Sequence, residues 1–380
     1  MKKHQNLGVE WTTEPDYKTG IAVTKLCDYA GHFHHLYFTN PGWYCGGRKL
    51  VVIGDRQNAT NLFGIDLQSG EITQLTEFAD RPKEGLFGSC VNPVRNEICF
   101  WHGRVLRAMS LDTLEERELW TLPEGQNEGG LNVTADGKYV MTVTSEDMSR
   151  LNLEFMKGYG YLGWEKYCAA KPLCQIVRVP ADGGKAEILH AGNVWMGHMN
   201  TSPKHATHLT FCHEGPWELV DNRIWAMDTA TGKIRPLRER RFPGERIGHE
   251  YWYADGERIG YHSLFQESKV IGNVSFDGSA VNEYEFNGLT HHIHSRDENL
   301  IVGDGERDGY VQLWRRNAAG VYDPARVLCC HHGSMHIQQS HIHPCFSPDG
   351  QYVLFTSDKT GYAAPYIARL PADLSTLPFA

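Results

Sequence analysis

The stretch Phe346-Ser-Pro-Asp-Gly-Gln-Tyr-Val-Leu-Phe-Thr-Ser-Asp358 decides the fold. Its Ser-Pro-Asp-Gly segment is a tight-turn sequence, and the run that follows has the apolar character of a buried β-strand. Related phrases, each a turn followed by an apolar run, begin near Asn40, Asn92, Ala135, Ser202, Ala254 and Arg296. Counted together with the first, the phrase occurs seven times along the chain.

A second phrase follows each copy of the first and consists of a strand, a tight turn and another strand. Leu62 to Leu75 and Ile176 to Leu189 are clear examples. Each unit therefore holds four short strands, and the units recur every 40 to 70 residues or so, a period typical of propeller blades and longer than that of most solenoids. The sequence predicts an all-β fold, a seven-bladed β-propeller.

The two ends of the chain predict how the ring of blades closes. Asp16 to Cys27 resembles the second half of a second phrase without a first half before it. We expect this N-terminal strand to complete the last blade. Residues 147–170 interrupt the repeat and predict an inserted helix or loop, which is too short to form a core of its own. The expected organisation is a single domain over residues 1–380.

Composition narrows the class of function. A formal net charge of -9 and a pI near 6.1 argue against a nucleic-acid partner, because phosphate contacts require concentrated Lys and Arg. The sequence has neither the apolar stretch of an export signal nor that of a membrane span. We therefore expect a cytoplasmic protein without a membrane partner. Ten scattered cysteines without a Cys-x-x-Cys pair predict buried, reduced thiols.

Histidines concentrate in the last third of the chain. Eight of the twenty lie between His291 and His343. In His341-Ile342-His343 the two-residue period of a strand predicts both imidazoles on one face, with Gln338 one short turn upstream. His291, His292 and His294 stand just before the sixth blade phrase, and the His341–His343 run stands just before the seventh. The two runs should therefore lie at equivalent ends of adjacent blades and converge. Imidazole and amide donors without thiolate suit manganese, zinc, iron or calcium better than copper(I).

Two further phrases carry polar side chains at similar places. Phe211 to Trp225 predicts a loop between two blade strands that holds His213, Glu214 and Arg223. His249 precedes the Ala254 turn in the place that His341 occupies in its own blade, and His198 precedes the Ser202 turn in the same way. These side chains are expected at the same end of the blades as the metal cluster.

At these residues the chain resembles the oligogalacturonate lyase family of polysaccharide lyases. The most specific matches are Phe-Cys-His-Glu-Gly-Pro followed by Leu-Val-Asp-x-Arg, then His-Glu-Tyr-Trp, Gln-x-x-His-x-His-Pro and Leu-Phe-Thr-Ser-Asp. The four motifs occur in order, and the resemblance extends from the Asp16 strand to Tyr366. Where the family is expected to have a basic residue before the glutamine, this chain has Ile337.

The resemblance implies a set of functional residues and one divalent metal ion, for which manganese is predicted. The implied metal ligands are His292, Gln338, His341 and His343. His292 is chosen over His291 and His294 for its spacing to Ser295 and a strand face shared with His294. The implied base is His249, Arg223 is implied in both catalysis and substrate binding, and His198 and His213 in substrate binding.

The implied reaction is β-elimination from a small anionic oligosaccharide. Short oligogalacturonates, digalacturonate and unsaturated digalacturonate, would give unsaturated monouronates (5-keto-4-deoxyuronate) in pectin catabolism. The metal would hold the uronate carboxylate, His249 would remove the C5 proton, and Glu214 and Glu250 would orient histidines.

Two other functions fit a propeller of this kind. One is a four-histidine non-haem iron dioxygenase, which needs well-separated histidines and an apolar tunnel. The other is a non-enzymatic binding propeller, which has no need of a metal cluster. Assembly into a homo-oligomer is left open by the sequence.

Overall fold

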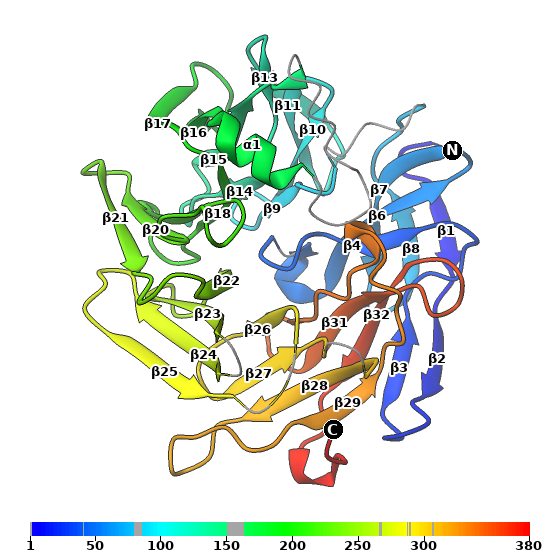
Figure 1. Ribbon diagram of the computed structural model, residues 1–380. Helices are drawn as coiled ribbons and strands as arrows, with labels where there is room; N and C mark the ends of the chain where they lie inside the picture. Colours follow the sequence, from blue (N-terminus) through cyan, green and yellow to red (C-terminus); the bar gives the residue numbers. More distant parts are fainter. Residues whose placement is uncertain are drawn as a thin grey trace. The chain divides into compact units, whose positions relative to one another are not determined.

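The computed structural model describes residues 2–40, 42–79, 86–149, 163–265, 268–286, 288, 290–305 and 308–380. The chain forms two compact units. The first unit combines Met1–Pro82 with Tyr284–Ala380, and the second unit is Lys83–Glu283. Seven antiparallel sheets account for the strands of the described residues, three in the first unit and four in the second (Figure 1). The seven sheets are the blades of a seven-bladed β-propeller, as the repeats predict.

Three blades belong to the first unit. Their strands, in spatial order, are β1 (Asn6–Val9), β8 (Glu71–Gln74), β7 (Ala59–Asp66), β6 (Lys49–Arg56) and β4 (Phe33–His35), with β5 (Trp43–Tyr44) also paired to β6; β26 (Ile293–Ser295), β27 (Leu300–Gly303), β28 (Tyr310–Arg315) and β29 (Arg326–Cys330); and β2 (Thr12–Pro15), β3 (Ala22–Lys25), β32 (Ala364–Arg369), β31 (Tyr352–Ser357) and β30 (Cys345–Phe346). Short 3-10 turns lie at η1 (Cys45–Gly47), η3 (Gln338–Ser340) and η4 (Leu374–Thr376).

Four blades belong to the second unit. Their strands are β9 (Cys90–Asn92), β10 (Glu97–His102), β11 (Val105–Ser110) and β12 (Glu116–Thr121); β13 (Gln126–Asn127), β15 (Tyr139–Glu146), β16 (Leu173–Pro180) and β17 (Glu187–Asn193), with β14 (Leu131–Val133) also paired to β15; β18 (Met196–Thr201), β19 (His208–His213), β20 (Ile224–Asp228) and β21 (Lys233–Arg238); and β22 (Arg246–Trp252), β23 (Arg258–Phe265), β24 (Ser268–Ser275) and β25 (Val281–Glu285).

The predicted closure by the N-terminal segment is confirmed. Strand β3 pairs with β32 through Val23 opposite Ala368 and Lys25 opposite Tyr366, and the two strands lie side by side in Figure 1. The turn before β3 is fixed as well, because the buried Asp16 accepts a 2.8 Å hydrogen bond from the backbone N–H of Cys330. Strand β2 adds a fifth strand outside β3, and β1 joins the first blade instead. Neither addition was predicted.

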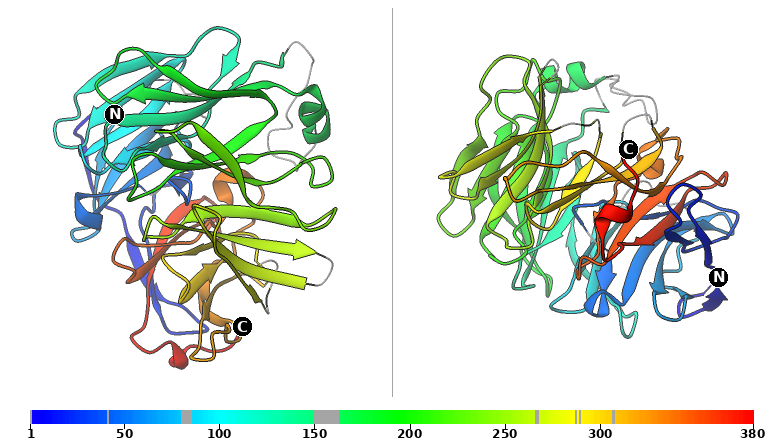
Figure 2. Two further views of the ribbon diagram at one scale, coloured as in Figure 1. Left: turned by 90° about the vertical axis from the view of Figure 1, so that its left-hand side faces the viewer. Right: turned by 90° about the horizontal axis from the view of Figure 1, so that it is seen from below.

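The interruption at 147–170 is partly described. Its last residues form the helix α1 (Trp164–Ala170), the short green helix of Figure 2, while residues 150–162 lie outside the described ranges. Trp164 and Tyr167 pack against Trp195 of the second unit, with ring centroids 5.3 and 4.8 Å apart. Packing of these aromatic rings explains why a helix, one of the two predicted forms, occurs here. Within the described ranges, neither α1 nor any other helix has the length and apolar character required to cross a membrane.

The cysteines behave as predicted. All ten are free thiols and eight of them are buried. They pack as small apolar side chains, which is the usual role of a buried thiol.

Candidate functional site

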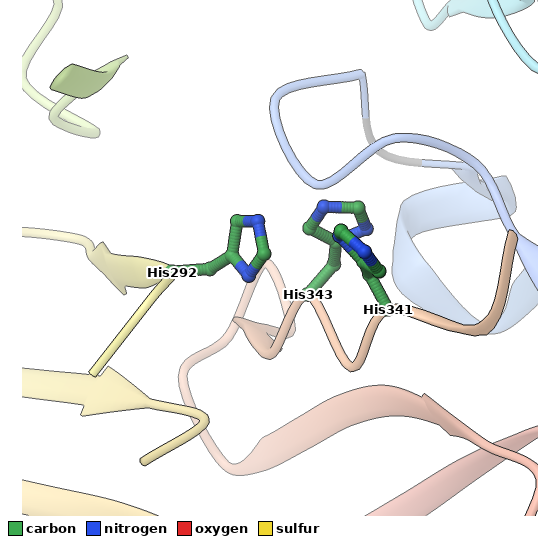
Figure 3. A group of neighbouring side chains, drawn as sticks. All are labelled: His292, His341 and His343. Carbon is green, nitrogen blue, oxygen red and sulfur yellow. The ribbon is translucent and has the colours of Figure 1, made fainter. Parts of the chain in front are cut away.

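Three imidazoles converge in the first unit. One ligand atom each from His292, His341 and His343 lies within 4.8 Å of the other two. The ring centroids of His292 and His343 are 4.2 Å apart, and His341 is 5.3 Å from His292. Figure 3 shows the three rings turned toward one another from two separate chain segments, one before β26 and one before β30. The predicted convergence of the two histidine runs is confirmed.

The backbone of His341–His343 differs from the predicted strand. Strand β30 begins only at Cys345, and His343 has a φ of 43°, in the left-handed region. Ile342 is fully buried in the core of the first unit, and its carbonyl accepts a 2.9 Å hydrogen bond from Thr356 N–H. The buried Ile342 therefore anchors the segment and holds His341 and His343 close together. The two rings therefore lie together because of Ile342 and a local left-handed turn, not because of strand pleating.

His292 is the member of the second histidine run that joins the cluster. Its Nδ1 lies 2.6 Å from Oδ2 of Asp304, and its backbone N–H donates to Oδ1 of the same carboxylate. Burial opposes ionisation of Asp304, but His292 and these hydrogen bonds lower its pKa to about 2. An ionised carboxylate on Nδ1 leaves Nε2 of His292 as the nitrogen available to a ligand.

The other two histidines of that run do not join the cluster. His291 is exposed, and Nδ1 of His294 accepts a hydrogen bond from the Phe346 backbone. The strand face expected to be shared by His292 and His294 does not form, because β26 begins at Ile293. The choice of His292 therefore agrees with the geometry, although the strand-face reason given for it was wrong.

Gln338 and two aromatic side chains also contact His343. The amide nitrogen of Gln338, the first residue of η3, is 3.3 Å from Nε2 of His343. Phe38 stacks on the His343 ring with centroids 5.5 Å apart, and Tyr37 meets it edge-on at 5.0 Å. These contacts fix the ring while keeping the amide of Gln338 within reach of the same centre.

The cluster has the properties of a cation site. Nδ1 of His341 is buried and has no hydrogen-bond partner among the residues that the structure describes. Burial, reinforced by the neighbouring His292, lowers the pKa of His341 to about 4. A buried imidazole nitrogen without a partner costs free energy unless a ligand binds it. The donor set of three imidazoles and one amide fits a divalent metal ion of borderline or hard character.

In the second unit, Arg223 lies in the predicted loop between β19 and β20. Its guanidinium is buried between two carboxylates, with Nη1 2.5 Å from Glu214 and Nε 3.4 Å from Glu250. Burial opposes the charge, but Cys212, Glu214 and Glu250 hold the pKa of Arg223 well above its ordinary value. Arg223 is therefore a fixed cation whose Nε and Nη1 are already engaged.

Of the two glutamates, Glu214 has the predicted role and Glu250 does not. Glu214 does orient a histidine, since its Oε2 lies 3.1 Å from Nε2 of His198. Among the described residues, the side chain of Glu250 forms an ion pair only with Arg223, and its Oε1 is buried without a hydrogen-bond partner there. The prediction that Glu250 orients a histidine was wrong, because the strand carries its side chain to the arginine.

His213 is the last residue of β19 and does not lie in the loop as predicted, because β19 continues through His213. Its Nδ1 is 2.7 Å from Asp221, and its ring stacks on Trp225 with centroids 4.6 Å apart. Nδ1 is therefore committed to the loop, and only Nε2 remains for a substrate contact.

His249 lies in an irregular part of β22. The pairing of β22 with β23 shifts between Gly248 and Tyr251, and His249 has a φ of 54°. Its Nδ1 is 2.6 Å from Nε2 of His262 on β23. A left-handed histidine within a bulge is a strained feature of the kind that clusters at functional sites.

The pairing registers show which blade positions correspond. His249 lies three residues before Trp252, which pairs with Ile259 of the next strand. His343 likewise lies three residues before Phe346, which pairs with Val353. His198 has the same relation to Thr201, and all three histidines have left-handed φ values between 42 and 54°. His249 therefore occupies the blade position that corresponds to His343, and not the position of His341 as predicted.

Several residues of the site were not predicted. Asp304 ends the apolar run of β27 between two glycines, and a carboxylate there could have been singled out. Phe38 and Tyr37 gave no signal in the sequence, because their partner His343 lies far along the chain. His262 gave none because its contact with His249 depends on the bulge in β22.

Replacing Arg223 with Met should destabilise the protein by about 3 to 5 kcal/mol, because Glu214 and Glu250 would stay buried without their counter-charge. Urea unfolding followed by tryptophan fluorescence measures this. Arg258→Met is the matched control, since its ion pair with Asp255 is one-third exposed and should change the free energy of unfolding by less than about 1 kcal/mol. A similar small change for Arg223→Met would contradict the prediction.

The fold and the cluster define a class: an all-β propeller with a candidate divalent-metal centre built from histidines of two blades. Comparison with known proteins then gives the family. The family model described as oligogalacturonate lyase matches residues 1–318, and the chain belongs to the oligogalacturonate lyase family.

Relatives and solved structures match the chain over nearly its whole length. The oligogalacturonate lyase of Dickeya dadantii (strain 3937) and the oligogalacturonide lyase of Pectobacterium atrosepticum are each 26% identical over 398 residues, covering 98% of this chain and 99% of the relative. A structure of oligogalacturonate lyase in complex with manganese superposes with a TM-score of 0.88 at 26% identity, covering 99% of this chain and 100% of the other. The Vibrio parahaemolyticus oligogalacturonate lyase gives 0.86 at 27% identity, covering 98% and 99%.

Family membership identifies the chain as an enzyme of the lyase class. It confirms the resemblance drawn from the four motifs. It also favours a lyase over the iron dioxygenase and the non-enzymatic propeller considered as alternatives.

Proposed function

We propose that the chain is an oligogalacturonate lyase that cleaves digalacturonate and unsaturated digalacturonate by metal-assisted β-elimination. The products would be unsaturated monouronates (5-keto-4-deoxyuronate), formed in pectin catabolism. The observation that carries the proposal is the His292, His341 and His343 cluster with its unpartnered buried nitrogen, in a chain of this family.

The difficulty of the reaction lies in the proton at C5 of the uronate, which is a weak acid next to a negatively charged carboxylate. A divalent cation bound to that carboxylate would neutralise its charge and stabilise the developing enolate. In this chain, His292 through Nε2, His341, His343 and the amide of Gln338 would hold the ion. Manganese is the proposed ion because the donor set suits it and because a similar lyase structure is a complex with manganese.

His249 is the proposed general base. Its Nδ1 is engaged by His262, so Nε2 is the nitrogen that would take the C5 proton. A base of this kind must be neutral near pH 7 and within hydrogen-bond reach of the proton. Histidine is the side chain that meets the first requirement without a large change of pKa.

Arg223 is proposed to bind a substrate carboxylate. Glu214 and Glu250 fix the guanidinium through Nη1 and Nε, so Nη2 remains for the sugar. A fixed arginine offsets the charge that grows as the proton leaves. His198 and Nε2 of His213 are proposed as further sugar contacts. Glu214 and Glu250 both pair with Arg223, so we do not propose them as an acid/base carboxylate couple of the glycosidase kind.

The proposed partner is a small anionic oligosaccharide. A net charge of -9 does not oppose this, since the field at a metal ion and an arginine is positive. The cytoplasmic location, the absence of nucleic-acid and membrane partners, and assembly into a homo-oligomer stay predictions.

A direct assay tests the proposed function. The purified protein is incubated with digalacturonate, and ultraviolet absorbance follows the conjugated C4–C5 double bond while mass spectrometry identifies the products. We expect an absorbance rise that a chelator abolishes and unsaturated monouronate as a product. No absorbance rise, or products with the mass of hydrolysed sugar, would refute the lyase assignment.

Asp304→Asn should weaken manganese binding by about 10- to 100-fold, because the carboxylate that orients His292 and raises its basicity is lost. Isothermal titration of metal-free protein with manganese measures the change. Asp323→Asn, at an amide-bonded aspartate in the loop after β28, is the control and should bind as wild type. Equal affinity of Asp304→Asn and wild type would show that Asp304 does not support the centre.

A further inference from the structure

The proposed base His249 has a partner that neither the family comparison nor the motifs identify. Its Nδ1 is 2.6 Å from Nε2 of His262, and the two ring centroids are 4.8 Å apart at an interplanar angle of 50°. The contact joins two side chains of one blade in the second unit. It is a short nitrogen-to-nitrogen hydrogen bond in which one imidazole must donate and the other accept.

The backbone brings the two rings together in an unusual way. Gly248 lies opposite His262, and the next regular pair is Tyr251 with Gly260, so two residues of β22 face Tyr261 alone. The bulge and the left-handed φ of His249 turn its ring back over β23. The same bulge sends the next side chain, Glu250, to Arg223.

His262 is held more regularly than His249. It lies on β23, which pairs on both sides, with His262 opposite Ile271 of β24. A side chain on an interior strand has a fixed backbone, which is the support that a precise site requires. The strained residue is thus positioned by an unstrained neighbour.

The role of His249 as the base determines which of its ring nitrogens carries the proton before the reaction. If Nε2 of His249 takes the C5 proton, its lone pair must be free beforehand, so the ring proton of neutral His249 resides on Nδ1. That N–H donates to Nε2 of His262, which must be the unprotonated nitrogen of a neutral ring. After the transfer, the same hydrogen bond stabilises the imidazolium. The electron pair of the broken C5–H bond forms the C4–C5 double bond as the C4–O bond breaks. The oxygen leaves with the departing sugar, keeps the electron pair of the C4–O bond and takes a proton from solvent water.

We propose that His262 is a positioning residue for the lyase reaction, which sets the tautomer and orientation of His249 by accepting the hydrogen bond from its Nδ1. The inference rests on the proposed function, in which His249 is the base. His262 takes up no proton in this role and does not touch the substrate.

Two variants separate this role from simple packing. His262→Phe removes the acceptor but keeps a ring, whereas His262→Gln keeps an acceptor near the position of Nε2. For the manganese-loaded enzyme with digalacturonate, we expect His262→Phe to lower kcat by about 10- to 100-fold with KM within about twofold of wild type. His262→Gln should recover most of the lost kcat. Thermal melting checks that each variant is folded, and His262→Leu replaces the Phe variant if that one is not.

The outcomes decide between clear alternatives. A kcat of wild-type size in a folded His262→Phe or His262→Leu variant would overturn the proposal. Equal losses in the Phe and Gln variants would also overturn it, since an acceptor alone would then not suffice. His205→Gln, at a histidine paired with the exposed Glu257, is the matched control and should leave both constants unchanged. Failure of the proposed function would appear separately, as an inactive wild-type enzyme or a fully active His249→Ala variant.

Discussion

His249→Ala is expected to lower kcat for digalacturonate cleavage by about 1,000-fold, the middle of the range for loss of a positioned general base. The structural reason is that His262 holds Nδ1 of His249, so Nε2 is the proposed acceptor of the C5 proton. Absorbance of the unsaturated product measures kcat and KM. We expect KM to change little, because the base contributes mainly to the transition state.

The control for this variant is His205→Ala, which removes another histidine of the second unit. His205 pairs with the exposed Glu257 at 2.7 Å and has no place in the proposed mechanism. It should retain wild-type activity. A His249→Ala variant that stayed within about tenfold of wild type would exclude His249 as the base while leaving the family membership intact.

The second large effect is expected at the histidine cluster. His341→Ala should weaken manganese binding by at least about 100-fold and lower activity in parallel when the metal is limiting, because one of the imidazole ligands is lost. His341 is the ligand of choice for this test because its buried Nδ1 has no partner among the described residues, so its removal breaks no hydrogen bond of that nitrogen. Titration calorimetry gives the affinity, and activity is measured over a range of manganese concentrations.

The matched control lies in the same unit. His332 is exposed and stacks on Tyr17, and its replacement by Ala should alter neither manganese affinity nor activity. If His341→Ala bound manganese as tightly as the wild type, the cluster would not be the metal centre.

The fold could be predicted from the sequence because its repeat is local. The Phe346 phrase combines a turn and a strand within thirteen residues, and each copy carries turn-forming Pro, Asp, Asn or Gly residues. The closing strand β3 was predicted for the same reason. The additional pairings of β1 and β2 were not, because these exposed edge strands lack the apolar alternation that marks a blade strand.

The candidate site could be predicted in part. Residue type and order pointed to His341 and His343, yet their alignment arises from the buried Ile342 and a left-handed His343. Among three candidate histidines, the structure brings His292 into the cluster through Asp304, twelve residues downstream and across a strand pair. The sequence of the His291–His294 run does not show which histidine makes this tertiary contact.

The second unit shows the same limit. A bulge in β22 decides that Glu250 reaches Arg223 and that His249 reaches His262. The Gly248-His249-Glu250 sequence does not specify a bulge, so both partners had to come from the structure. Arg223 itself was placed in the correct loop because that loop follows the predicted end of a blade strand.

The histidine cluster is proposed to hold one catalytic metal ion for β-elimination. The most direct measurement is the rate of absorbance increase on digalacturonate as manganese is added stepwise to metal-stripped protein. A rate that starts near zero and reaches a plateau at one manganese ion per chain is predicted. A metal-stripped protein with the full rate, or one that no amount of manganese activates, would contradict this role of the histidine cluster.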